Sequence, residues 1–202
     1  MGLGNPGREH ARDRHNVGFM VADALRERWA LPEPKKRFAG VICEGRIGGG
    51  PPGSGAHETP RARVALLWPQ TYMNDVGRSV GPARGALKLA IERVLVIHDE
   101  IDLPFGEVRA RTGGGLAGHN GLKSVARALG GPGFSRVRVG VGRPDSTDPS
   151  IVSAHVLGPF REEPRQVAAL IERAGDEVER LVLEPAYTGA ERGPIVGWRD
   201  GA

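Results

Sequence analysis

The chain has 202 residues, 39% of them hydrophobic, which is enough to build the core of one domain. Its single cysteine, Cys43, excludes an internal disulfide framework and a multi-cysteine zinc site, so we expect a reducing, cytoplasmic setting. No apolar run reaches the length of a membrane-spanning helix, and the net charge of +4 indicates a nucleic-acid partner only if the basic residues cluster beside a site.

The first part of the chain predicts one helix and a pair of strands. Apolar residues recur at helical spacing over 17–29, with Asn16 as a candidate N-cap. Two strand-like runs follow at 38–47 and 64–68. The Gly- and Pro-rich stretch 48–63 between them predicts a long, mobile hairpin loop.

The rest of the chain alternates helices and strands. The expected elements are a helix over 75–90, a buried strand over 93–99, an alternating strand over 106–111, a helix over 120–129, a strand over 136–141 and an amphipathic helix over 162–183. This order predicts a single α/β domain over 1–185, with a twisted mixed β-sheet and helices packed on both sides. Residues 186–202 show no periodicity and are expected to form a loose tail.

Residues 2–7 read GLGNPG and satisfy G-x-G-x-x-G, a fingerprint of dinucleotide-binding turns. Such a turn follows a hydrophobic strand and opens directly into a helix, whose N-terminus meets the pyrophosphate. Here only Met1 precedes Gly2, and residues 8–15 (REHARDRH) show no apolar stripe. Pro6 also removes a backbone donor from the turn. A nicotinamide or flavin site is therefore disfavoured, and we expect no cofactor.

The chain has no G-x-S-x-G turn and no histidine pair at the spacing of a zinc helix, which disfavours covalent catalysis and a metal site. What recurs instead is histidine, aspartate and asparagine beside loops or element ends. A histidine oriented by an aspartate can deprotonate water, and carboxamides can hold a peptide or a developing oxyanion. These groups suit acyl hydrolysis without a covalent intermediate. Taken singly, Asn16, Asn74 and Asn120 are equally explained as helix caps, and a His–Asp pair is often structural.

Six motifs occur in order along the chain: GLGNPG (2–7), RHNVGF (14–19), PQTYMN (69–74), HDEIDLPFG (98–106), GGGLAGHNGLKS (113–124) and RVRVGVGRP (136–144). Together they resemble the bacterial-type peptidyl-tRNA hydrolase family over about residues 2–183. The resemblance implies a monomeric, metal-free α/β enzyme that cleaves the ester between a peptide and the 3′ ribose of tRNA. Such an enzyme recycles tRNA from prematurely released peptidyl-tRNA.

Carried onto this chain, the resemblance implies three catalytic residues. His15 is the base that activates water, Asp99 stabilises the working form of its imidazole, and Asn74 anchors the peptide end and places the reacting carbonyl. The resemblance also implies substrate contacts from Asn5, His10, Tyr72, Met73, His119 and Asn120. Among these, Asn5 helps to distinguish a blocked α-amino group from a free one.

The resemblance further implies a basic surface that binds the acceptor stem. Arg111 and Arg138 match positions that grip phosphate, and Lys123 and Arg127 on the nearby helix add to that surface. Phosphate contacts position RNA without reading its sequence, which suits an enzyme that accepts every elongator tRNA. Solvation alone would equally explain the polar face of strand 106–111, which carries Arg111.

The chain departs from the family pattern near the site. Only Met1 stands where the family has several residues of a first strand, His10 replaces the usual aromatic residue, and Trp68 replaces a frequent lysine. The loop over 48–63 is also longer than usual. The same fold serves a plant RNA-splicing factor with no hydrolytic role, so a non-catalytic RNA-binding protein is the alternative function. The complete set of histidine, aspartate and asparagine residues disfavours that alternative.

Overall fold

The computed structural model describes residues 1–48 and 61–184. Within this part of the chain the α-helices are α1 (Val17–Arg28), α2 (Gly77–Ala86), α3 (Asn120–Leu129), α4 (Pro149–Val156) and α5 (Pro164–Leu183). The strands are β1 (Lys35–Arg37), β2 (Gly40–Ile47), β3 (Ala62–Pro69), β4 (Leu95–Glu100), β5 (Val108–Thr112) and β6 (Ser135–Gly140). Two short 3-10 turns, η2 (Arg14–Asn16) and η3 (Met73–Asp75), contribute to the site. None of the described helices is both long and apolar enough to cross a membrane.

The strands form two three-stranded sheets that residues 1–3 join into one layer. The sheet orders are β1-β2-β3, which is antiparallel, and β4-β6-β5, in which β4 and β6 are parallel. The Gly2 N–H donates to the Leu67 carbonyl of β3 at 3.2 Å, and the Leu3 N–H donates to the Ile97 carbonyl of β4 at 2.9 Å. The predicted α/β class and the mixed strand layer are confirmed.

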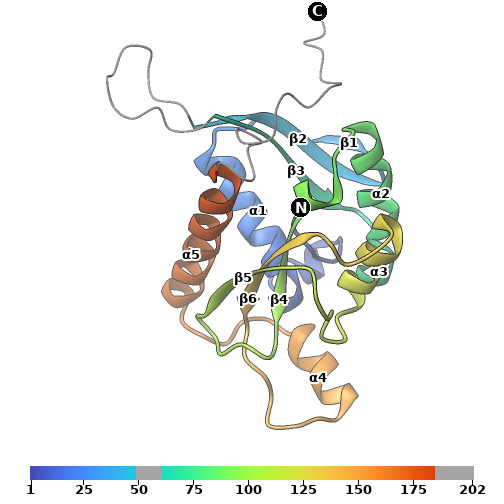
Figure 1. The fold of residues 1–202 in the computed structure, drawn as a ribbon. Coiled ribbons are helices and arrows are strands. Elements are labelled where there is room, and N and C mark those ends of the chain that lie inside the picture. The colour runs from blue at the N-terminus through green and yellow to red at the C-terminus, as the bar shows by residue number, and fades with distance from the viewer. Residues whose placement is uncertain (49–60, 185–202) are drawn as a thin grey trace, which may run out of the picture.

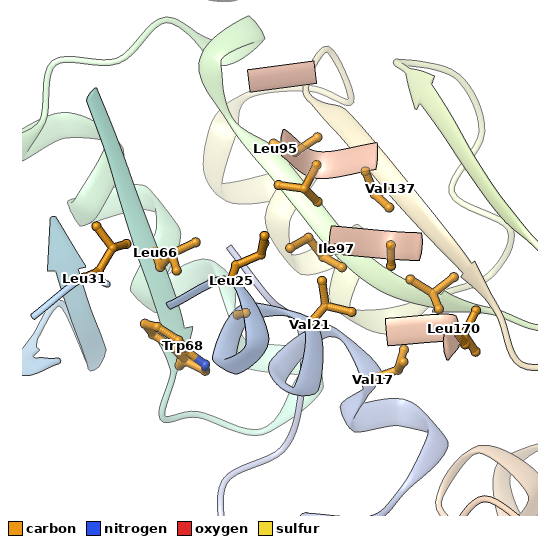
Figure 2. Packing of buried hydrophobic residues seen from close by; sticks show 14 of the residues in the cluster. Val17, Val21, Leu25, Leu31, Leu66, Trp68, Leu95, Ile97, Val137 and Leu170 are labelled. Carbon is orange, nitrogen blue, oxygen red and sulfur yellow. The ribbon is translucent and has the colours of Figure 1, made fainter. Parts of the chain in front are cut away.

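Each face of this layer carries a hydrophobic core, so helices pack on both sides as predicted (Figure 1). On one face, Val21 of α1 and Leu170 of α5 belong to one buried cluster with Ile97 of β4 (Figure 2). On the other face, α2 and α3 gather around Val96, with Val80 among their buried side chains. Val96 and Ile97 are neighbours in one strand and therefore point to opposite faces.

The opening glycines allow the first residues to run close against α1. A Cβ atom on Gly2 would lie 2.2 Å from the Gly18 carbonyl oxygen, and one on Gly18 would lie 2.4 Å from the Ile97 carbonyl oxygen. The chain then makes two 3-10 turns, and α1 begins only at Val17. Gly2 therefore permits backbone packing, and no helix opens from the glycines toward a pyrophosphate.

Several element boundaries differ from the sequence-based expectation. Apolar periodicity does not predict β1, because its three residues are all exposed. It does not predict α4 either, because none of the side chains of α4 is buried. Helix α2 ends at Ala86 rather than at residue 90, and Lys88 follows with φ of 51°, outside the helical region. The predicted β-hairpin is confirmed by the pairing of β2 with β3. Most of its expected loop (49–60) and the expected tail lie outside the described residues.

Candidate active site

The predicted site residues meet at one edge of the strand layer. Residues 1–3 run parallel to β4, so Asn5 after the first segment and Asp99 near the end of the second lie at the same edge. The other polar residues come from short turns and from the start of a helix: His15 in η2, Asn74 in η3, His119 as the N-cap of α3 and Asn120 as its first residue.

Two histidines share one carboxylate oxygen. The His15 Nδ1 lies 2.8 Å from Asp99 Oδ1, and the His119 Nε2 lies 3.1 Å from the same oxygen. The two imidazole rings are 4.9 Å apart between centroids. Asp99 is only 3% exposed, whereas both histidines are partly exposed. The structure therefore brings the predicted base, its carboxylate and a predicted substrate-binding histidine into one hydrogen-bonded cluster.

The hydrogen bonds fix which nitrogen of each ring carries the proton. The His119 Nδ1 accepts from the backbone N–H groups of Gly121 at 3.1 Å and Leu122 at 3.4 Å, so the proton of its neutral ring is on Nε2. That Nε2–H donates to Asp99. His15 donates to the same carboxylate through Nδ1–H, which leaves its Nε2 with a free lone pair. His15 is thus the ring that is set up to accept a proton.

The electrostatics of the cluster favour the same assignment. Burial by itself lowers the pKa of His15, but the charge and hydrogen bond of Asp99, with a smaller contribution from Asp13, outweigh burial and raise that pKa above its ordinary value. Burial by itself would raise the pKa of Asp99, but His15 and His119 together hold it far below the usual range for a carboxyl group. Asp99 is therefore ionised at neutral pH and increases the basicity of His15.

A third histidine, His98, lies behind this cluster. Its Nδ1–H donates to the Asp99 carbonyl oxygen at 2.6 Å, and its Nε2 is buried with no partner in the part of the chain that the structure describes. Burial, followed by the nearby His119, lowers the pKa of His98 to about 3, so its ring stays neutral. It meets the His119 ring edge-on, with centroids 5.1 Å apart. His98 therefore adds packing to the site without adding charge.

Asn16 is the N-cap residue of α1, as predicted, but its side chain makes no capping hydrogen bond. Its Oδ1 accepts from the Asn5 N–H and its Nδ2 donates to the Asn5 carbonyl, both at 2.9 Å. Asn5 in turn accepts from the Met73 N–H through Oδ1 at 2.8 Å. The predicted position of Asn16 at the start of α1 is therefore confirmed, while its side chain has a different role. The residue clamps the backbone of Asn5, and the Asn5 Nδ2 is left without a protein acceptor among the described residues.

The remaining predicted contact residues differ in exposure. Asn74 and Asn120 are exposed, and neither carboxamide makes a hydrogen bond within the described residues; the cap of α3 is His119. Tyr72 is 64% exposed, whereas Met73 is buried and its sulfur fills the space above Gly121, where a Cβ would lie only 2.5 Å away. The side chains of the two asparagines and Tyr72 are thus accessible to a ligand, whereas Met73 packs against the start of α3.

His10 is tied to its own loop. Its Nδ1 lies 2.8 Å from Asp13 Oδ2, and its side chain is partly exposed while that of Asp13 is buried. The partly exposed imidazole therefore stays in the opening loop, and its predicted contact with the substrate remains a prediction.

Arginines gather on one face of β5 and β6. Strand pairing places Arg111 opposite Arg136 and Arg109 opposite Arg138, so the four side chains share a face. Arg138 pairs with the buried Glu100 through Nε at 2.9 Å, whereas Arg111 is exposed with no carboxylate partner in the described residues. The predicted partners Lys123 and Arg127 are exposed on α3. Sequence reasoning missed Arg136, although an arginine inside a strand of alternating valines is a signal that could have singled it out.

The geometry is that of an α/β protein with a carboxylate-oriented histidine at one edge of a strand layer and arginines beside it, an arrangement that suits acyl hydrolysis. The sequence model of the peptidyl-tRNA hydrolase family matches residues 1–191, and the chain belongs to this family. The resemblance found in the sequence motifs is thereby confirmed.

Relatives and solved structures agree with this assignment. The chain is 47% identical over 191 residues to the peptidyl-tRNA hydrolase of Mycobacterium sp. (strain KMS), covering 92% of each chain. It is 44% identical to the peptidyl-tRNA hydrolase of Parvibaculum lavamentivorans, over 95% of this chain and 87% of the relative. Its fold is similar to a crystal structure of the Acinetobacter baumannii peptidyl-tRNA hydrolase, with a TM-score of 0.75, 36% identity and coverage of 94% and 88%.

Proposed function

We propose that this protein hydrolyses the ester bond between the peptide and the 3′ ribose of peptidyl-tRNA, with water activated by His15. The observation that carries the proposal is the cluster at Asp99, whose carboxylate accepts from His15 Nδ1 and His119 Nε2 and leaves His15 Nε2 free. Family membership supports the substrate class. The catalytic unit is the α/β domain over 1–185, and it acts as a monomer on free peptidyl-tRNA.

In this mechanism the His15 Nε2 takes a proton from water, and the resulting hydroxide attacks the ester carbonyl carbon. The imidazolium that forms is stabilised by ionised Asp99, whose pKa is held low by both histidines. The tetrahedral intermediate then breaks its bond to the 3′ oxygen, which receives the proton from His15 Nε2. The products are a peptide with a free carboxyl group and a tRNA with a free 3′ hydroxyl, and no enzyme atom is bonded to either.

Carboxamides and basic residues hold the substrate in this proposal. Asn74 and Asn120 expose carboxamides that have no partner among residues 1–48 and 61–184, and these can donate to the peptide and to the developing oxyanion. The free Nδ2 of Asn5 faces the peptide end, where it recognises a blocked α-amino group. His10 and Tyr72, whose side chains are at least partly exposed, also contact the substrate. Arg111, Arg138 and Lys123 neutralise phosphates of the acceptor stem, which is the sequence-independent part of RNA binding.

The hydrogen bonds of His119 bear on whether a metal ion takes part. Ligand atoms of His15, Asp99 and His119 lie within 4.8 Å of one another, which is close enough to surround an ion. For His119 to ligate through Nε2, that nitrogen would have to lose its proton while Nδ1 accepts from two backbone N–H groups. Ligation would therefore break the hydrogen bonds by which His119 caps α3. We propose a metal-free reaction, for which a chelator leaves the rate unchanged.

The test is single-turnover release of labelled peptide from an N-acetylaminoacyl-tRNA. The variant His15→Ala should release peptide at least a hundredfold more slowly, because the general base is missing, and should retain tRNA binding. The control is His155→Gln, since His155 lies on α4 and contacts the Gly142 carbonyl rather than Asp99. Undiminished release by His15→Ala would contradict the mechanism. Binding of tRNA without any release by the wild-type protein would favour the non-catalytic RNA-binding alternative.

A further inference from the structure

A buried arginine holds the glycine loop that leads into the site. Arg136 is 1% exposed, and its guanidinium donates to the Gly115 carbonyl at 2.9 Å through Nη1 and to the Gly113 carbonyl through Nη2. Its Nε is buried without a partner in the described residues. The planar guanidinium therefore binds two carbonyl oxygens of one short loop at the same time, as a bidentate donor.

The charge of Arg136 is not explained by an ion pair. Among the described residues no carboxylate contacts it, and burial first, followed by Arg111 and Arg138, lowers its pKa, with only Glu100 opposing. Burying a charged group without a paired charge costs free energy of folding. If Arg136 only filled space in the fold, an apolar residue would stabilise the protein more. What an arginine supplies at this position is a pair of N–H donors for the carbonyls of Gly113 and Gly115.

The loop that Arg136 holds contains several residues with positive φ and carries site residues at its end. Gly113 and Gly114 have φ of 64° and 78°, and Ala117 has φ of 47°, a conformation that is uncommon for a residue with a Cβ. The guanidinium of Arg111 also packs against the loop, since a Cβ on Gly114 would lie 2.4 Å from its Nη2. The chain continues directly into His119, so displacement of the loop moves the Nε2–H that donates to Asp99.

We infer that Arg136 is a positioning residue of the hydrolytic site. It fixes the loop over 113–118, and the loop in turn fixes His119 against Asp99 and sets the position of the Asn120 carboxamide. The inference rests on the proposed function, because positioning is measured as turnover of peptidyl-tRNA. It differs from the phosphate-binding role proposed for Arg111 and Arg138, because a side chain with 1% exposure, whose Nη1 and Nη2 already donate to loop carbonyls, is not accessible to an RNA phosphate.

The test compares Arg136→Gln and Arg136→Lys with the matched control Arg84→Gln. Arg84 also donates to backbone carbonyls, at Leu89 and Leu129, but far from the site at the other end of α2 and α3. Two substrates are used: a full N-acetylaminoacyl-tRNA, and an N-acetylaminoacyl ester of the trinucleotide CCA, which lacks the acceptor stem. Melting temperatures and the folded fraction are measured for each variant, so that rates are expressed per folded molecule.

Arg136→Gln should lower kcat about a hundredfold on both substrates, because a shift of about 1 Å in the reacting groups costs that much, while KM changes less than about threefold. Arg136→Lys should recover part of kcat, because its ammonium can reach one carbonyl but not both. Arg84→Gln should leave both kinetic constants unchanged. In the NMR spectrum, the ring signals of His119 should move in Arg136→Gln and stay in place in Arg84→Gln.

Two results would overturn the inference. A raised KM on the tRNA substrate alone, with kcat intact, would make Arg136 a phosphate ligand. An unaltered kcat per folded molecule, with a lowered melting temperature, would make it a purely structural residue. Absence of turnover by the wild-type protein would refute the proposed function instead, and the His119 ring signals would then still decide whether Arg136 positions the loop.

Discussion

The substitution Asp99→Asn isolates the contribution of charge to the site. Both histidine N–H groups point at Asp99 Oδ1, and a carboxamide oxygen at that position can still accept from both. The variant therefore keeps the hydrogen bonds and the shape while removing the negative charge. The charge acts on His15 only when that ring is protonated, which in the proposed mechanism is during attack on the ester.

The expected loss follows from this geometry. With charge centres about 4 Å apart and an effective dielectric constant of about 20, Coulomb's law gives about 4 kcal/mol. Since 1.4 kcal/mol corresponds to about a factor of ten in rate, kcat should fall about a thousandfold. The control Asp102→Asn removes an exposed carboxylate that pairs with Arg143, and it should leave kcat unchanged.

The pH dependence gives an independent measure of the same effect. His15 must be unprotonated to act as a base, so the rate falls as the pH drops through its pKa, which the charge of Asp99 raises above 6.5. Without that charge, burial dominates and lowers the pKa, so the acid limb should move below pH 6.5 in Asp99→Asn. Single-turnover release measured between about pH 5 and 9 gives both quantities. A kcat within tenfold of the wild type, or an acid limb that stays in place, would refute this reasoning.

Substitutions at three further positions test the contacts that hold the helices in place. His119→Asn keeps an N-cap acceptor for α3 but loses the imidazole Nε2–H that donates to Asp99, so the melting temperature should stay the same while kcat falls. His119→Ala removes the cap as well and should lose about 1 kcal/mol of stability. Equal melting curves for the two variants would contradict the capping role of His119. Gly18→Ala places a Cβ 2.4 Å from the Ile97 carbonyl oxygen and should lower the free energy of unfolding by about 3 kcal/mol in urea denaturation; an unchanged midpoint would show that α1 shifts freely. Arg28→Ala removes the ion pairs of α1 with three carboxylates of α5, Glu172, Asp176 and Glu179. It should cost about 1 kcal/mol at low salt and less in about 1 M NaCl, and a salt-independent loss would rule out an electrostatic origin.

Apolar periodicity predicted those elements that bury a face. Helices α1, α3 and α5 and strands β2, β3, β4 and β6 each bury apolar side chains in one of the two cores, so their pattern is visible in the sequence; β5 adds only the partly buried Val108. Strand β1 and helix α4 bury nothing, and they are held by backbone pairing and by loop contacts, which leave no apolar period. The joining of the two sheets by residues 1–3 depends on contacts with residues far along the chain, which a local pattern does not contain.

The motifs predicted which residues gather in the site, but not how they divide the hydrogen bonds. Asn16 has the residue type and position of a cap, yet its carboxamide holds the backbone of Asn5. Histidine is not among the usual N-cap residues, so nothing in the sequence marks His119 as the cap of α3. Arg136 and Arg138 alternate in the same strand and look equivalent, and only burial separates the loop-holding residue from the partly exposed one.

The pairing of residues 1–3 with β4 sets an order for folding during synthesis. The first residue donates to the Leu95 carbonyl, 94 positions later in the chain, so the segment stays unpaired on that side until about half of the protein has been made. Closing so long a loop carries an entropic cost that is repaid only when the neighbouring strand and both cores form together. Asn5 and His15 follow this segment, and Asp99 lies on the strand that completes it. A nascent chain therefore has no assembled His15–Asp99 pair until β4 has emerged, and the proposed general base acquires its carboxylate in the same step that closes the sheet.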